Sequence, residues 1–122
     1  MPHALRDQLI EPIPLPAADI AQCKTYRDAC LLAWDRRTFL KMQKTHLSAM
    51  TGIPAPHVTL YFHRSPVDRH GRRRPVLPAD FIARVEFALG NTAISQFLEY
   101  ERATVRESMR TGGALLRLLF SV

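Results

Sequence analysis

Cysteine is scarce in this chain, and no long apolar run is present. Only Cys23 and Cys30 occur among the 122 residues. In a single helix they would lie about 10 Å apart, so a disulfide between them is geometrically unreasonable. We expect both to fill the core as small apolar side chains in a reducing cytoplasm. Pro12, Pro14 and Pro16 interrupt the N-terminal region, which therefore shows neither a signal peptide nor a membrane span.

The residue patterns of common enzymes are also missing. There is no phosphate-cradling glycine loop and no Gly-x-Ser-x-Gly turn, and the acidic residues are scattered. His46, His57, His63 and His70 match no compact zinc spacing, and neither cysteine accompanies them. We therefore expect no catalytic residue, no bound metal and no cofactor. A binding protein is the favoured class.

Basic residues are concentrated in one stretch of the chain. The net charge is +6, and residues 36–74 contain nine Lys or Arg against a single acid, Asp68. The neighbouring segments 1–35 and 75–111 are slightly acidic. A solvated loop would explain the cluster Arg72–Arg74 but not this uneven distribution. The clustering favours a nucleic acid as the partner.

The spacing of apolar residues predicts an all-α fold. No segment alternates with period two over a convincing length, and the chain length suits one modest core. We expect a compact bundle of about five helices. These are placed from Asp19 to about Arg37 or Thr38, at 43–51 and 55–63, from near Pro78 to Leu89, and from a cap at Asn91 to Gly112 and Gly113.

Three segments follow from this assignment. Residues 1–18 are rich in proline and are expected to form an extended arm. Residues 19–111 would form the helical domain. Residues 112–122 would be an apolar C-terminal tail.

The second and third expected helices outline a helix-turn-helix. Leu47 and Met50 would form an inward stripe on the first helix, and Gly52 would take the left-handed conformation that turns the chain. Ile53 and Val58 would fill the angle between the helices. The second helix would then lie across the surface, free to enter a DNA major groove.

This order of helices resembles the lambda-repressor-like DNA-binding family over about residues 19–100. Residues 47–53, Leu-Ser-Ala-Met-Thr-Gly-Ile, resemble the first motif helix and turn of that family, and Val58 matches a buried position of its recognition helix. Residues 81–91 resemble its following helix, which often ends in Leu-Gly-Asn. The chain departs from the pattern at Lys44, where glutamine is usual, at Ser48, where alanine is commoner, and in its long arginine-rich loop.

The resemblance implies a DNA-binding surface on the second motif helix and the loop after it. Thr59 and His57 can hydrogen-bond base edges, and Ala55 or Leu60 can touch a thymine methyl. For His57 and His63 an ordinary exposed histidine is the open alternative. This helix has no Arg, Asn or Gln, so discrimination would depend on DNA shape and on the loop arginines. The expected DNA-binding residues are Gln43, Lys44, Thr45, Ala55, Pro56, His57, Thr59, Leu60, His63, Arg64, Arg69, Arg72, Arg73 and Arg74.

These features predict a sequence-specific double-stranded DNA-binding transcription regulator. We expect a phage-type or bacterial repressor that acts as a homodimer at an operator, in the cytoplasm and associated with the nucleoid. One alternative is a protein-interaction module, such as an antitoxin or adaptor, in which DNA binding is secondary. Another is a nonspecific nucleic-acid binder.

The C-terminal third is expected to form the dimer. One helix-turn-helix covers one half-site, so two copies about one DNA turn apart are the usual arrangement. The alternative is that the apolar tail folds back onto its own domain and the arm. The expected interface residues are Ile94, Phe97, Leu98, Leu115, Leu116 and Leu119.

Overall fold

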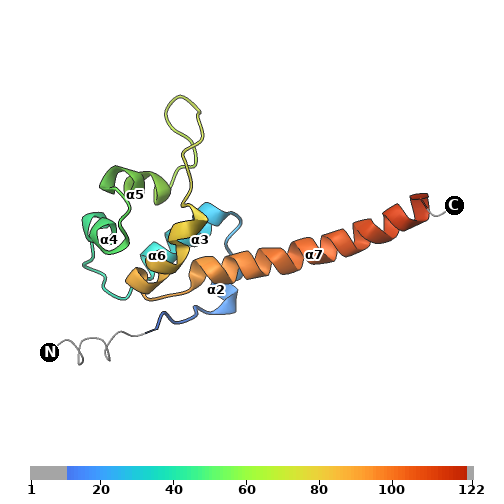
Figure 1. Ribbon diagram of the computed structural model, residues 1–122, viewed down its shortest axis with the longest axis horizontal. Coiled ribbons are helices and arrows are strands. Elements are labelled where there is room, and N and C mark those ends of the chain that lie inside the picture. The colour runs from blue at the N-terminus through green and yellow to red at the C-terminus, as the bar shows by residue number, and fades with distance from the viewer. Residues whose placement is uncertain (1–10, 121–122) are drawn as a thin grey trace.

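The chain folds as a bundle of helices from which one helix extends (Figure 1). The computed structural model describes residues 11–120, except for the side chains of Ala114 and Leu115. The expected all-α fold is confirmed, and no strand occurs among the described residues. The helices are α2 (Ala17–Ala21), α3 (Tyr26–Asp35), α4 (Lys44–Thr51), α5 (Ala55–Tyr61), the short 3₁₀ helix η1 (Ala79–Phe81), α6 (Ile82–Leu89) and α7 (Ala93–Phe120).

The region predicted as one helix from Asp19 contains two helices, α2 and α3, so the prediction of a continuous helix is wrong. Thr25 and Asp28 form a capping box that starts α3 anew. The Asp28 N–H donates to Thr25 Oγ1 at 3.1 Å, and the Asp28 carboxylate accepts from the Thr25 N–H at 3.1 Å. Cys23 lies in the link between the helices and Cys30 in α3, and both are buried free thiols, as expected.

The core lies where α3, α4, α6 and α7 meet. α3 packs against α7, and α4 packs against α5 and α6. Val85 and Leu89 of α6 are fully buried. Asn91 is also buried, and its Nδ2 donates to the Ala33 carbonyl at 3.0 Å. These contacts hold together the packed part of the molecule, from α2 to the first turns of α7, which we call the body and which includes α4 and α5.

The proline-rich arm is held along the start of α7. The Ile13 N–H donates to the Gly90 carbonyl at 3.1 Å, and the Thr92 N–H donates to the Ile13 carbonyl at 3.0 Å. The Gln96 side chain binds both the N–H and the carbonyl of Leu15, at 2.9 and 2.8 Å. Residues 11–16 are therefore extended, whereas α2 begins before the expected end of the arm. Residues 1–10 of the predicted arm lie outside the described residues.

α7 is longer than predicted. Its first turn is capped as expected, since Asn91 Oδ1 accepts from the Ala93 N–H at 3.2 Å. Gly112 and Gly113 do not end it, because neither takes the positive φ of a helix-ending glycine. Residues 112–120 thus continue the helix and form no separate tail. Nowhere in residues 11–120 does a helix have the length and apolar content that crossing a bilayer requires.

Candidate nucleic-acid interface

The predicted helix-turn-helix is present at α4 and α5. Gly52 ends α4 with φ 81°, the left-handed conformation that a residue without Cβ adopts readily. Ile53 and Val58 are fully buried and fill the angle between the two helices, as expected. Pro54 precedes α5 as its N-cap residue, where a missing N–H costs nothing. The bounds of both helices agree with the prediction to within two residues.

Met50 is a correction to the predicted inward stripe. Its side chain is 57% exposed, whereas Leu47 is fully buried. Thr51, four residues after Leu47, takes the second inner position instead. Its hydroxyl donates to the Leu47 carbonyl at 2.7 Å, which allows a polar residue to be buried there without cost to its hydrogen bonding.

The outer face of α5 is open to solvent. Ala55, Pro56, His57 and Thr59 are exposed, and Leu60 is half-buried. Neither α4 nor α5 contains an acidic residue. The residues expected to contact bases are therefore gathered on one accessible surface that would not repel phosphate.

His63 does not belong to this outer face. It follows the end of α5, is half-buried, and its Nδ1 accepts from the Ser65 N–H at 3.0 Å. Its backbone carbonyl is also bound, by Arg27 at 3.0 Å. These bonds hold His63 in the turn after the helix, and a base contact by its side chain stays a prediction.

Residues 65–74 form an ordered hairpin, which we call the basic hairpin. The Asp68 N–H donates to the Arg72 carbonyl at 2.8 Å, and the Arg74 N–H donates to the Pro66 carbonyl at 2.9 Å. The Asp68 carboxylate also accepts from the N–H groups of His70 and Arg72 at 2.8 and 2.9 Å. The single acid of the basic stretch therefore shapes the turn. Figure 1 shows the hairpin projecting from the body after α5.

The arginines expected to bind phosphate fall into two groups. Arg69 and Arg73 are exposed and make no ion pair among the described residues. Arg72 forms an exposed pair with Asp68 at 3.5 Å, which phosphate can replace at little cost. Arg74 is a correction, because its half-buried guanidinium donates to backbone carbonyls within the hairpin, including that of Ser65 at 3.4 Å.

Arg64 is also engaged. Its guanidinium lies 2.9 Å from the Asp35 carboxylate, and this hydrogen bond raises the pKa of Arg64 further above its ordinary value. Both side chains are largely exposed, so the pair contributes little to stability. Arg64 is available to DNA only if this pair opens.

The start of α4 offers a second set of predicted contacts. Gln43 and Thr45 are exposed and Lys44 is half-buried. The Gln43 N–H donates to His46 Nδ1 at 2.9 Å, which fixes the backbone at the first turn. A phosphate can approach the exposed residues of this turn.

Arg27 of α3 is a residue of the candidate interface that was not among the expected site residues. It is 5% exposed, and burial lowers the pKa of its guanidinium, which nevertheless stays charged at neutral pH. Among residues 11–120 it forms no ion pair with a carboxylate. Its five hydrogen bonds all go to backbone carbonyls, those of Leu60 (2.9 Å), Tyr61 (3.2 Å) and His63 (3.0 Å) at the end of α5, and those of Arg74 (3.2 Å) and Pro75 (3.0 Å) at the base of the basic hairpin.

This arrangement places one cation between the two parts of the candidate interface. The C-terminal end of a helix carries partial negative charge on its unpaired carbonyls, so a guanidinium is favourable there. Arg27 thereby fixes the hairpin relative to α5. The signal was present in the sequence, because Arg27 lies four residues after Cys23 and three before Cys30, on the apolar stripe of the predicted helix.

A shallow hollow of about 530 Å³ lies between the start of α3 and the hairpin, and its lining includes Thr25, Arg64 and Arg73. No group of three or more His, Cys, Asp or Glu in the described part of the chain is arranged to hold a metal ion.

Comparisons with protein-family models, with curated proteins and with solved structures gave no match for this chain.

Proposed function

We propose that this protein is a sequence-specific double-stranded DNA-binding regulator, a phage-type or bacterial repressor that occupies its operator as a homodimer. The observation that carries the proposal is the joining of an exposed recognition helix to a basic hairpin by Arg27. The resemblance to the lambda-repressor-like family supports it, and so does the positive charge concentrated at residues 36–74.

The two parts of the surface would divide the work of recognition. α5 would enter the major groove with His57 and Thr59 toward the base edges. Arg69, Arg72 and Arg73 of the hairpin would bind phosphates, which position the protein without reading sequence. Because α5 lacks Arg, Asn and Gln, DNA shape would supply part of the discrimination.

Selection from a random duplex library tests the proposal. The full chain should enrich a pseudo-palindromic site and bind it about 10³-fold or more tightly than bulk DNA at the same salt concentration. Thr59→Ala and His57→Ala should each cost about 1–3 kcal/mol on the selected site and little on random DNA. Thr104→Ala, an exposed helical threonine on α7, is the matched control and should change neither affinity.

Two results would count against base contacts by α5 and phosphate contacts by the hairpin. Equal losses on selected and random DNA would demote His57 and Thr59 from base contacts to phosphate or structural contacts. Absence of any preferred site would favour a nonspecific nucleic-acid binder.

A protein-interaction module, such as an antitoxin or adaptor, is the second candidate. The observation in its favour is the exposed apolar surface on the outer half of α7, where Leu116, Leu118 and Phe120 are all exposed. A stable complex with a different protein, isolated together with this chain and lost when α7 is truncated, would support that function.

A further inference from the structure

No other described part of the chain covers the outer half of α7. Ile94 and Phe97 are buried in the body, so these two residues of the predicted dimer interface are not available to a partner. From Leu98 to Thr111 every residue is exposed, and so are Leu116 to Phe120. At 1.5 Å per residue this free segment is about 30 Å long, and Figure 1 shows it leading away from the end of the molecule that carries α4 and α5.

Such a segment is not expected to be helical by itself. Most of the stability of a helix in a protein comes from packing of its apolar face rather than from helix propensity, and glycine is the poorest helix former after proline. Gly112 and Gly113 lie in its middle, with open space where a Cβ would point. A continuous helix across this pair therefore implies stabilisation by a partner on one of its faces.

The exposed apolar side chains of this segment follow a seven-residue repeat. Leu98, Val105, Gly112 and Leu119 are spaced by seven, and Met109 and Leu116 form a second series four residues after Val105 and Gly112. These are the d and a positions of a heptad, which bring one stripe toward a partner helix. The large side chains of the stripe are 38% to 69% exposed. Arg102 is the one charged residue at an a position, where a polar side chain sets register at some cost in stability.

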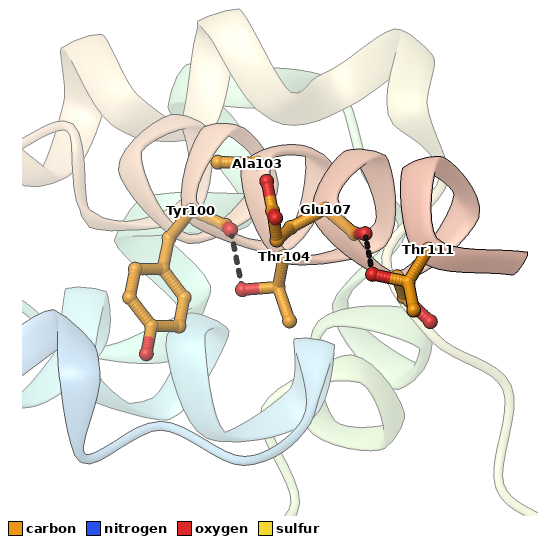
Figure 2. A pocket seen from close by; sticks show the side chains of 6 residues that line it. Tyr100, Ala103, Thr104, Glu107 and Thr111 are labelled. Atoms are coloured by element: carbon orange, nitrogen blue, oxygen red, sulfur yellow. Dashed lines mark hydrogen bonds between the residues drawn. The ribbon is translucent and has the colours of Figure 1, made fainter. Parts of the chain in front are cut away.

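Between Tyr100 and Thr111 the face of α7 opposite the stripe is mostly polar, and its threonine hydroxyls donate to carbonyls of the same helix. Figure 2 shows its residues along the helix, where they line a shallow hollow of about 470 Å³. Thr104 and Thr111 donate to the carbonyls of Tyr100 and Glu107 at 3.1 and 3.2 Å. This face offers little to a partner helix and supplies control positions. Its members are Tyr100, Ala103, Thr104, Glu107, Ser108 and Thr111.

The charges beside the apolar stripe identify the partner. Glu101 is at a g position and Arg106 is at the following e position, and neither belongs to an ion pair within residues 11–120. In a parallel, in-register pair each g residue faces the e residue five positions later in the other helix. Glu101 would then face Arg106 of a second copy, twice by symmetry. Antiparallel pairing would instead match g with g and e with e, and would lose this complementarity.

We propose that residues 98–120 form a parallel, in-register coiled coil with the same segment of a second copy of this chain. This inference specifies the homodimer of the proposed function and rests on it in that respect. Parallel pairing puts both bodies at one end of the coiled coil. Two α5 helices are then related by a two-fold axis, as a pseudo-palindromic site requires.

Sedimentation equilibrium of the full chain tests the pairing. The wild type should have the mass of a dimer, and Leu116→Glu should raise the dimer dissociation constant on the order of 100-fold by placing two carboxylates in the apolar seam. Leu118→Glu is the matched control. Leu118 is 77% exposed at an outward c position, so this variant should remain a dimer. A monomeric wild type, or a Leu116→Glu chain with unchanged dissociation constant, would overturn the proposal.

Charge exchange tests the predicted partners. Glu101→Arg and Arg106→Glu should each weaken the dimer about fivefold, because like charges then face each other across the seam. The double variant should return to the wild-type dissociation constant. A double variant weaker than both single variants would contradict the Glu101–Arg106 contact.

Disulfide trapping tests the orientation. Under mild oxidation Leu119→Cys should give a covalent dimer, because the two copies of residue 119 meet in a parallel pair. Leu118→Cys should not. A sedimentation dimer that Leu119→Cys fails to trap would be antiparallel, which would overturn the proposal.

Failure of this inference can be separated from failure of the proposed function. Binding to a single DNA half-site is measured with the monomeric Leu116→Glu chain. Half-site binding by a chain whose wild type is monomeric would reject the coiled coil and leave DNA binding standing. A trapped parallel dimer without affinity for any duplex would support the coiled coil and reject DNA binding.

Discussion

The body and the outer half of α7 use glycine in opposite ways. In the body, Gly52 and Gly90 end α4 and α6 at φ 81° and 86°, and the chain after each enters the core at the buried residues Ile53 and Asn91. In α7, Gly112 and Gly113 lie far from the core and the helix continues through them. A glycine therefore marks a helix end here only where the residue after it has a buried position to reach.

Arg27→Met offers the largest effect by which to test how the body is held together. The change removes the guanidinium that donates to five partly buried backbone carbonyls, and we expect a loss of about 3 kcal/mol or more in the free energy of unfolding. Urea denaturation measures it. Arg69→Met, at an exposed position of the hairpin, is the control and should change stability by less than about 0.5 kcal/mol. Equal stabilities of the two variants would show that Arg27 does not clamp α5 to the hairpin.

Gly52→Val tests the turn between α4 and α5. A β-branched residue at positive φ is strained even where space is open, so we expect destabilisation of about 1–3 kcal/mol. Thermal and urea unfolding provide the measurement. An unaltered melting temperature would mean that the left-handed turn is not at Gly52.

Gly113→Ala should stabilise the protein, in contrast to Gly52→Val, and its effect on stability should be the smallest of the three. Because Gly113 takes no positive φ and a Cβ would meet open space, alanine should stabilise the helix by about 1 kcal/mol. Helix content from circular dichroism at 222 nm should rise while the DNA affinity per half-site stays the same. Loss of helix content on this substitution would contradict a continuous α7.

The local features of the fold were largely predictable from the sequence. Gly52, Ile53 and Val58 define the motif turn, and the apolar spacing that ends at Gly90 defines α6, because neighbouring residues decide both. The break between α2 and α3 was missed, since the capping box of Thr25 and Asp28 was overlooked within a longer apolar stripe. The end of α7 was also placed wrongly, because an isolated Gly-Gly pair carries no information about a partner.

The candidate site was predictable in outline but not in its contacts. The exposed positions of α5 follow from helical periodicity. The sequence does not show that Arg74 is engaged within the hairpin while Arg69 and Arg73 are exposed, because this difference depends on how the hairpin folds around Asp68. Arg27 escaped notice because its carbonyl partners are 33 to 48 residues away in the chain. The inward position of Arg27 on its helix follows from its spacing to Cys23 and Cys30, but its partners do not, because tertiary contacts leave no local pattern.

The most direct test of the proposed DNA-binding surface is the salt dependence of affinity for Arg69→Ala/Arg73→Ala. The slope of log affinity against log salt should decrease in steepness by about 1.8 units, since each lost phosphate contact contributes about 0.9, and it should do so on selected and random duplexes alike. Arg110→Ala/Arg117→Ala removes the same charge from the outer half of α7 and is the control. A slope unchanged by the hairpin variant, or lowered equally by the α7 variant, would contradict the placement of DNA on α5 and the basic hairpin.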